Sequence, residues 1–200
     1  MKSVFDYIVK PLGGRYSNSI KVGDGELILN TEVFNHQYIN RLGVVISTPL
    51  HNPLGLQVDD EVLIHHNVFR RWHNMKSVEK NSRSFLNEDE YLVSSDQMYM
   101  YKRNNCWVAL PGYTFVKPIK TKDQYSLSPE KPLVGIVKYS DGTFLPTQLV
   151  GFSPGDEFEF IVDGERLYRV MNKFINIEYE YKGDEEEYNP SWAESCGRTN

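Results

Sequence analysis

Histidine side chains are the first candidates for chemistry in this chain, because imidazole is both a metal ligand and a general base. His65, His66 and His73 are close in sequence, and His51 precedes them. Adjacent residues of a β-strand point to opposite faces, so we expect His65 and His66 not to share an ion. No cysteine or carboxylate stands at a zinc-like spacing from them. The sequence therefore predicts no metal site and no other cofactor.

Catalytic motifs are absent from the sequence. It contains no Gly-x-Ser-x-Gly elbow, no phosphate-binding loop and no dinucleotide-binding fingerprint. Carboxylates are plentiful, but their spacing alone brings no two of them together. We therefore expect that the protein is not an enzyme.

One segment combines basic and aromatic residues: Arg70-Arg71-Trp72-His73, followed by Lys76, Lys80 and Arg83. Such a segment can contact single-stranded nucleic acid, or it can be a solvated hairpin or a loop that faces a protein partner. The whole chain carries a net charge of -5. Because a nucleic-acid binder normally shows a basic stripe, the charge favours the second interpretation.

The composition favours β-structure in a soluble, intracellular protein. Thirteen Tyr and ten Phe with few Ala suit strands better than helices. Cys106 and Cys196 are too few for a disulfide scaffold. No secretory or membrane-spanning apolar run is present, so we expect a cytoplasmic protein without membrane contact. For a viral chain, that compartment is the cytoplasm of the host cell.

The strongest pattern is an internal repeat, in which four segments of the first half return in the same order in the second. The first members are Val9-Lys10-Pro11-Leu12, Leu42-Gly43-Val44-Val45, the stretch 55–64 and Tyr91-Leu92-Val93. The second members are Val116-Lys117-Pro118-Ile119, Val134-Gly135-Ile136-Val137, the stretch 151–160 and Tyr168-Arg169-Val170. In the third pair, Asp60-Glu61 matches Asp156-Glu157. The repeat predicts two domains of the same fold.

Period-two alternation of apolar and polar residues predicts that these domains are built of short strands separated by Gly, Pro and Asp turns. We find no amphipathic helix, and expect an all-β fold with two tandem β-barrels. The predicted first barrel covers residues 1–103, with a long mobile loop at 13–41 and an inserted hairpin at 66–89. The second covers 104–181, and 182–200 forms a polar, flexible tail.

The order of these motifs resembles that of the GroES-like co-chaperonins, small β-barrels that cap chaperonin cages. The matching motifs are Val9-Lys10-Pro11, Gly43-Val44-Val45, Val58-Asp59-Asp60-Glu61-Val62 and Glu90-Tyr91-Leu92-Val93-Ser94-Ser95-Asp96. The second copy keeps the strands but carries Asn172-Lys173-Phe174 in place of the Ser-x-Asp element. The resemblance spans roughly residues 4–181.

This resemblance implies a docking loop. In the family, a glycine-led aliphatic triplet of the mobile loop binds an apolar groove of the chaperonin, which places Leu27, Ile28 and Leu29 in that role. Val33-Phe34 is a rival anchor, and residues 26–29 could instead be one more strand. The second loop, 120–132, has only Tyr125 and Leu127 as large apolar residues, and we expect it not to dock.

The function implied is that of a co-chaperonin, which caps a chaperonin ring that hydrolyses ATP. The implied state is a ring-shaped homo-oligomer. The alternatives are a structural or assembly module, such as a virion-associated one, built on the same barrels, and a barrel that binds a small ligand or single-stranded nucleic acid.

Overall fold

The computed structural model describes residues 2–16, 19–22, 25–28, 39–180 and 183–196. It divides into two compact units, Met1–Cys106 and Trp107–Asn200. Apart from 3₁₀ turns, the only helix in the described ranges is the short α1 (Ser191–Cys196), and antiparallel strands make up most of the rest. The prediction of an all-β fold is confirmed.

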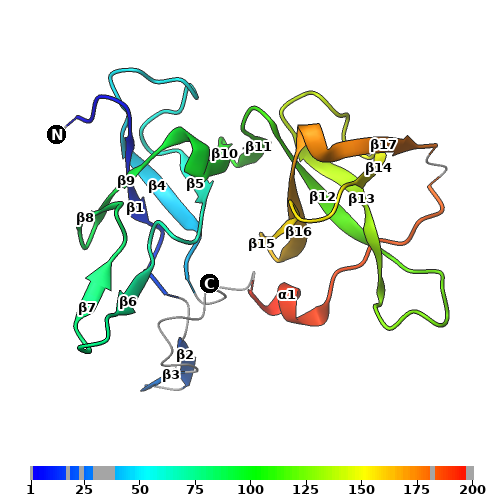
Figure 1. Cartoon of the computed structure of the whole chain (residues 1–200), viewed down its shortest axis with the longest axis horizontal. Helices are drawn as coiled ribbons and strands as arrows, with labels where there is room; N and C mark the ends of the chain where they lie inside the picture. Colours follow the sequence, from blue (N-terminus) through cyan, green and yellow to red (C-terminus); the bar gives the residue numbers. More distant parts are fainter. Residues whose placement is uncertain (1, 17–18, 23–24, 29–38, 181–182, 197–200) are drawn as a thin grey trace. The chain divides into compact units, whose positions relative to one another are not determined.

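The first unit contains a large sheet and two separate hairpins (Figure 1). Within this unit the large sheet has the order β10-β5-β4-β1-β9-β8, and the hairpins are β2–β3 and β6–β7; β11 follows β10 where the chain passes into the second unit. The strand bounds are β1 Tyr7–Pro11, β2 Ser19–Val22, β3 Gly25–Ile28, β4 Leu42–Ser47, β5 Glu61–Ile64, β6 Arg71–His73, β7 Glu79–Asn81, β8 Phe85–Asn87, β9 Glu90–Val93, β10 Met98–Arg103 and β11 Cys106–Ala109.

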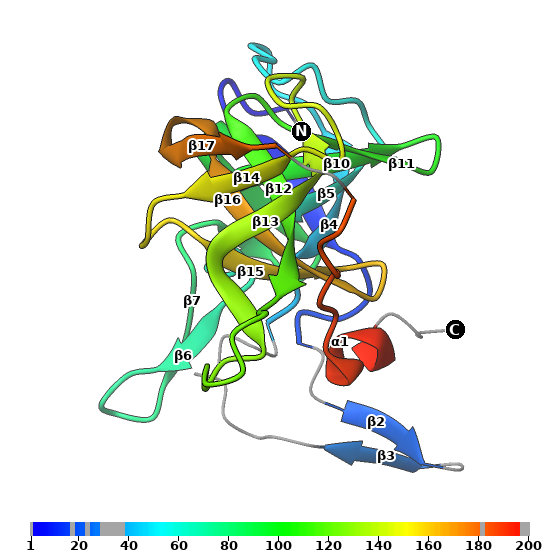
Figure 2. The same ribbon diagram turned by 90° about the vertical axis from the view of Figure 1, so that its right-hand side faces the viewer.

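The second unit contains one six-stranded sheet with the order β15-β16-β12-β13-β14-β17 (Figures 1 and 2). The strand bounds are β12 Tyr113–Lys120, β13 Glu130–Ser140, β14 Leu149–Phe152, β15 Phe158–Val162, β16 Glu165–Met171 and β17 Ile175–Tyr179. Within the described residues, the outermost strands of neither large sheet pair with each other. Each large sheet is therefore open and does not close into a barrel.

The two units share one strand order, since β8-β9-β1-β4-β5-β10 corresponds position by position to β15-β16-β12-β13-β14-β17. A 3₁₀ turn also precedes the last strand of each set, at Ser95–Gln97 and at Asn172–Phe174. The internal repeat is thus a repeat of topology as well as of sequence.

The pairing registers agree residue by residue. Val9 faces Val45 in β1–β4, and Val116 faces Val137 in β12–β13. A bulge interrupts each pair of strands just before these valines. Tyr91 of β9 faces Val9, and Tyr168 of β16 faces Val116. Three of the four sequence matches are therefore structurally equivalent.

The remaining match, the third pair (55–64 with 151–160), is wrong. Asp60 leads into β5, which pairs with β4 and β10, whereas Asp156 leads into β15, which pairs with β16. The true counterpart of β5 is β14, because β14 pairs with β13 and β17 in the matching registers. A Gly, Asp and Glu turn before a strand is a common local device, so the same letters occur at two different corners of the fold.

Each unit has its own apolar core between the strands. Val9, Val45, Leu63, Met98 and Met100 are fully buried in the first unit. Those in the second that are at most 2% exposed include Phe115, Val116, Val137, Val150, Leu167 and Val170. Tyr99, between Met98 and Met100, is also buried, because the strand bulges there.

Glycine is required at one equivalent position of each sheet. A Cβ on Gly43 would lie 2.4 Å from Val9 Cγ1 and 2.9 Å from the carbonyl oxygen of Lys10. A Cβ on Gly135 would lie 2.7 Å from the carbonyl oxygen of Lys117. Two backbones approach closely at both places, which explains the Gly-Val and Gly-Ile motifs.

Part of the expected free tail packs against the second sheet (Figure 2). Glu187 bridges to Ile119, and the Lys120 N–H donates to the carbonyl oxygen of Glu186 at 2.8 Å. Lys117 pairs with Glu187 at 2.8 Å, and Lys122 with Glu185 at 3.2 Å. β12 pairs with β16 only at its first residues, 113–116. The acidic segment therefore lies along the rest of the same edge of β12.

Candidate docking site

The predicted docking triplet begins in the β2–β3 hairpin of the long segment between β1 and β4. Leu27 pairs with Ile20 and Ile28 pairs with Ser19, while Leu29 lies outside the described residues. Val33 and Phe34 also lie outside them. Residues 25–28 therefore form a strand. Among the described residues, the hairpin to which this strand belongs pairs with no strand of the large sheet.

Backbone contacts close the base of this segment. Tyr16 forms an isolated bridge with Ile39, and the Asn40 N–H donates to the carbonyl oxygen of Arg15 at 3.0 Å. The side-chain amide of Asn40 donates to the carbonyl oxygens of Leu12 and Gly14 at 2.8 and 2.9 Å. Entry and exit of the segment are therefore held together before the β2–β3 hairpin begins.

Arg15 anchors this base to the first unit. Its guanidinium donates to the carbonyl oxygen of Phe69 at 3.2 Å and to Asn81 Oδ1 at 2.8 Å. It also lies 5.5 Å from the ring centre of Tyr91, and only 9% of its side chain is exposed. An arginine that is largely shielded from solvent and hydrogen-bonded at a loop base fixes the direction in which the loop leaves the sheet.

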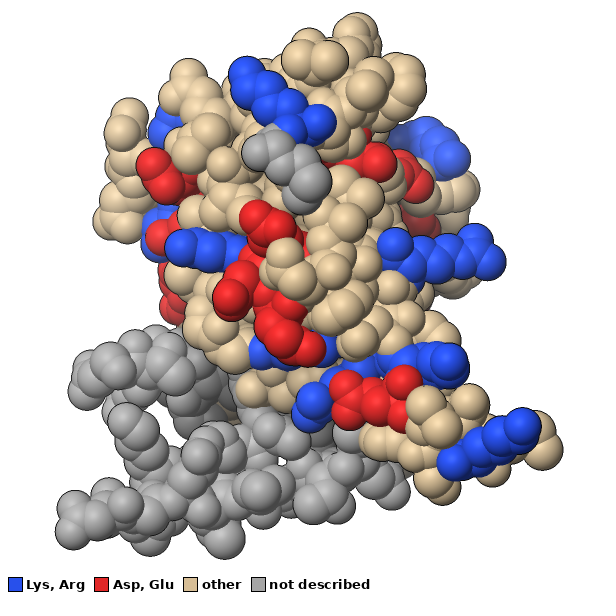
Figure 3. Space-filling model, turned by 90° about the vertical axis from the view of Figure 1, so that its left-hand side faces the viewer, with Lys and Arg blue, Asp and Glu red and all other residues tan. Residues whose placement is uncertain are grey.

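Tyr16 makes the second anchor. Its hydroxyl accepts the Arg71 N–H at 2.9 Å and donates to the Arg71 carbonyl oxygen at 3.3 Å. The Arg71 guanidinium lies 5.1 Å from the Tyr16 ring centre. The base of the long segment is therefore clamped to the β6–β7 hairpin, which Figure 3 shows projecting at the lower right of the first unit. Sequence reasoning missed both anchors.

The counterpart segment of the second unit, between β12 and β13, is shorter and differently built. Thr121 N–H donates to the carbonyl oxygen of Pro129 at 3.0 Å, and Asp123 Oδ1 accepts the Tyr125 N–H at 2.9 Å. Tyr125 and Leu127 are almost fully exposed, at 94% and 106%. The two apolar side chains are thus accessible, but they do not form a contiguous triplet.

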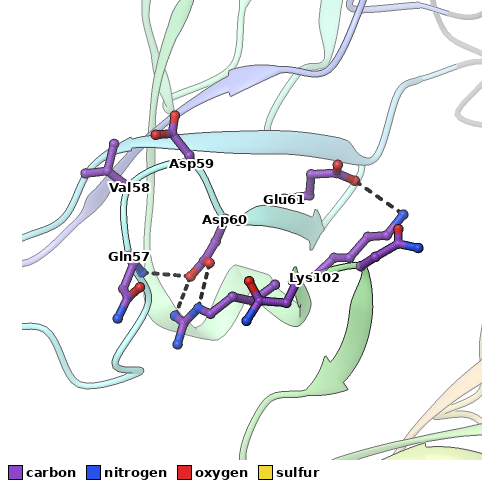
Figure 4. Close-up of a pocket in the computed structure, with 9 residues that line it drawn as sticks. Gln57, Val58, Asp59, Asp60, Glu61 and Lys102 are labelled. Carbon is purple, nitrogen blue, oxygen red and sulfur yellow. Dashed lines mark hydrogen bonds and ion pairs between the residues drawn. The ribbon is translucent and has the colours of Figure 1, made fainter.

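A cavity of about 290 Å³ lies at the turn before β5, lined by residues 57–61 and 102–105 (Figure 4). Asp60 Oδ2 accepts the Gln57 N–H at 2.7 Å and Arg103 NH2 at 2.6 Å, and Oδ1 accepts Arg103 Nε at 2.9 Å. Burial raises the pKa of Asp60, but the bonds from Arg103 and Gln57 outweigh it and lower that pKa below its ordinary value. Both carboxylate oxygens of Asp60 are occupied by hydrogen bonds that hold the turn. We therefore assign the polar groups that line this cavity a structural role.

His65 and His66 do not lie in a strand, contrary to the expectation from the sequence. β5 ends at Ile64, and the chain turns at His65 and His66 instead of continuing as a strand. Their rings therefore stack, with centroids 4.2 Å apart, and do not point to opposite faces. Within the described ranges, no three His, Cys, Asp or Glu side chains are grouped so that they could hold a metal ion.

Comparisons of the chain with protein-family models, with curated proteins and with solved structures found no match. Over the part of the chain that the structure covers, no helix is long and apolar enough to cross a membrane.

Proposed function

We propose that this protein is a tandem co-chaperonin of the GroES type, which caps a chaperonin ring by docking the long loop of its first unit. The observation that carries the proposal is the repeated strand order with one unequal loop. Between equivalent strands, the first unit has 30 residues (12–41), and the second has nine (121–129). Binding residues are often found in loops that a rigid scaffold positions, and this loop differs between two units that share one scaffold.

A triplet of aliphatic side chains suits weak docking repeated at many sites. Burial of Leu27, Ile28 and Leu29 would contribute about 5–8 kcal/mol. Ordering the loop would cost about 1 kcal/mol for each residue fixed, which offsets most of that gain. One loop alone therefore binds poorly, and several loops on a ring bind through effective concentration.

A ring requires contacts between chains, and the edge strand β17 offers one. Its Ile177 is 50% exposed and its Tyr179 is 37% exposed. In the GroES family, edge strands of neighbouring subunits pair around the ring, and we assign that role to β17. Pairing removes an unpaired strand edge, which is otherwise a site of aggregation.

The partner chaperonin would hydrolyse ATP, and this protein would hydrolyse none. It would work in the cytoplasm that holds the chaperonin, which is the host's for a viral chain.

Native mass measurement of the protein with a purified GroEL-type chaperonin, with and without ATP, tests the proposal. The expected result is an ATP-dependent complex that contains several copies of this chain. A monomer that associates neither with itself nor with the chaperonin would refute it.

A second candidate function is a structural or assembly module that uses the same domains without a chaperonin. The observation in its favour is that Leu27 and Ile28 lie in a paired strand, β3, as one more strand of the fold would. Self-association of the chain with no affinity for the chaperonin, in the same mass experiment, would favour this module.

A further inference from the structure

The β6–β7 hairpin has a tip that is held by its own hydrogen bonds. Asn74 Oδ1 accepts the N–H groups of Lys76 and Val78 at 2.9 and 3.0 Å, and the Asn74 N–H donates to the carbonyl oxygen of Val78 at 3.0 Å. Ser77 adopts the left-handed conformation that such a tight turn needs, with φ 57°. The tip is thus a defined structure that presents its side chains outward.

The hairpin is strongly basic within an acidic protein. Residues 70–83 contain five Lys or Arg and a single acidic residue, Glu79, which pairs with Arg71 at 3.7 Å. Lys76, Lys80 and Arg83 are exposed, and make no ion pair with the described residues. Met75 at the tip is fully exposed and Val78 is 51% exposed. Figure 3 shows basic side chains toward the end of this projection.

The same hairpin is fixed to the base of the docking loop. Tyr16 bonds to the backbone of Arg71 at the start of β6, and Arg15 bonds to Asn81 at the end of β7. A partner that binds the loop is therefore brought next to the basic tip.

We propose that the β6–β7 hairpin is a second contact surface for the same partner, and that it binds an acidic protein surface with an apolar recess for Met75. This inference rests on the proposed function. Exposed lysines at the rim of an interface steer encounter and fix orientation more than they add affinity. The hairpin would accelerate capture, and the aliphatic triplet would hold the complex.

The test compares two double charge reversals in the full chain. Lys76→Glu with Lys80→Glu removes the basic tip, and Lys2→Glu with Lys173→Glu is the control, since these two lysines are also exposed. Association with purified GroEL-type chaperonin and ATP is measured at low and at high salt. We expect the tip variant to associate at least about tenfold more slowly at low salt, with the difference shrinking at high salt. The control variant stays within about twofold of the natural protein.

Each of the following outcomes would overturn the inference. One is an unchanged association rate in the tip variant, or an equal loss in both variants, while the natural protein still binds. Another is that a labelled single-stranded oligonucleotide binds the natural protein and is lost in the tip variant, with capture of the chaperonin unchanged. Failure of the natural protein to bind the chaperonin would overturn the proposed function as well. The milder pair Lys76→Gln and Lys80→Gln repeats the test if charge reversal disturbs folding.

Discussion

Asp60 and Gln148 hold the same turn in the two units. Asp60 Oδ2 accepts the Gln57 N–H at 2.7 Å, and Gln148 Oε1 accepts the Leu145 N–H at 2.7 Å. The residues just before them, Asp59 and Thr147, both have left-handed backbones, with φ 73° and 74°. Each turn is also tied to one of two equivalent strands, by Arg103 of β10 to Asp60 and by Glu178 of β17 to Gln148. The two units therefore share the backbone conformation of this turn, but a carboxylate holds it in the first unit and an amide in the second.

The first turn should be more sensitive to acid than the second, in which an amide oxygen accepts the backbone N–H. The pKa of Asp60 is lowered in the folded protein, so its contribution is complete above its unfolded pKa, near 3.8, and is lost as the pH falls through the folded value. Gln148 does not titrate. Hydrogen exchange of the Gln57 and Leu145 amides, corrected for intrinsic rates, measures both turns in one sample. Protection of Gln57 should fall selectively below about pH 4.

Asp60→Asn provides the control for this titration. Asparagine keeps an acceptor for the Gln57 N–H, but it loses the two-point bond to Arg103. Because Arg103 is partly exposed, we expect a small loss in the free energy of unfolding, and no selective acid response at Gln57. Equal acid responses of Gln57 and Leu145 in the natural protein would contradict this account of the turn.

Tyr91 and Tyr168 are equivalent residues that should respond differently to removal of the hydroxyl. Tyr91 is fully buried, and its hydroxyl has no hydrogen-bond partner within the described structure. Burial raises the pKa of Tyr91 to about 12. The Tyr168 hydroxyl donates to Glu130 at 2.7 Å and accepts from Arg166.

Tyr91→Phe should therefore leave the free energy of unfolding unchanged or raise it slightly, since it removes an unsatisfied polar group. Tyr168→Phe should lower it by about 1–2 kcal/mol, because it breaks a bonded network. Denaturant unfolding of both variants measures the difference. A larger loss for Tyr91→Phe than for Tyr168→Phe would show that this assignment of the two hydroxyls is wrong.

The acidic segment on β12 should detach when its ion pairs are weakened. Lys117 contacts Glu187 at 2.8 Å and Glu165 at 3.2 Å, while Lys120 pairs with Glu186. Exposed pairs of this kind contribute about 0.2–1 kcal/mol each and are screened by salt. Glu186→Gln with Glu187→Gln should therefore speed exchange of the Lys120 amide, which bonds to the backbone of residue 186.

High salt should have the same effect on the natural protein. The Thr147 amide, which bonds to Val137 within the second unit, is the internal control. Unchanged exchange at Lys120 in the double variant would mean that the backbone contacts hold the segment without the charges.

The repeat could be predicted from the sequence where side chains are buried in register. Val9 and Val116, or Tyr91 and Tyr168, lie at equivalent points of a paired core, so packing limits the choice of residue. The turn before β5 could not be predicted in this way. Its counterpart at 145–148 needs only an acceptor at the fourth position and a left-handed third residue, and Asp-Asp and Thr-Gln both supply them.

The long segment between β1 and β4 was predictable in part. Its length and its aliphatic triplet stand out in the sequence, but its anchors do not. Arg15 and Tyr16 act through contacts with Phe69, Arg71 and Asn81, more than 50 residues away in sequence, and no local pattern reports such contacts. The packed acidic segment was missed for a similar reason, since a run of carboxylates is typical of a solvated tail unless a basic strand edge is available to it.

The central claim is the division of labour between the two copies, in which only the first loop binds the partner. Replacement of Leu27, Ile28 and Leu29 by Ser is compared with replacement of Tyr125 and Leu127 by Ser, and binding to a GroEL-type chaperonin with ATP is measured for both variants. We expect the first variant to lose binding and the second to bind like the natural protein. Equal effects of the two replacements would contradict the claim.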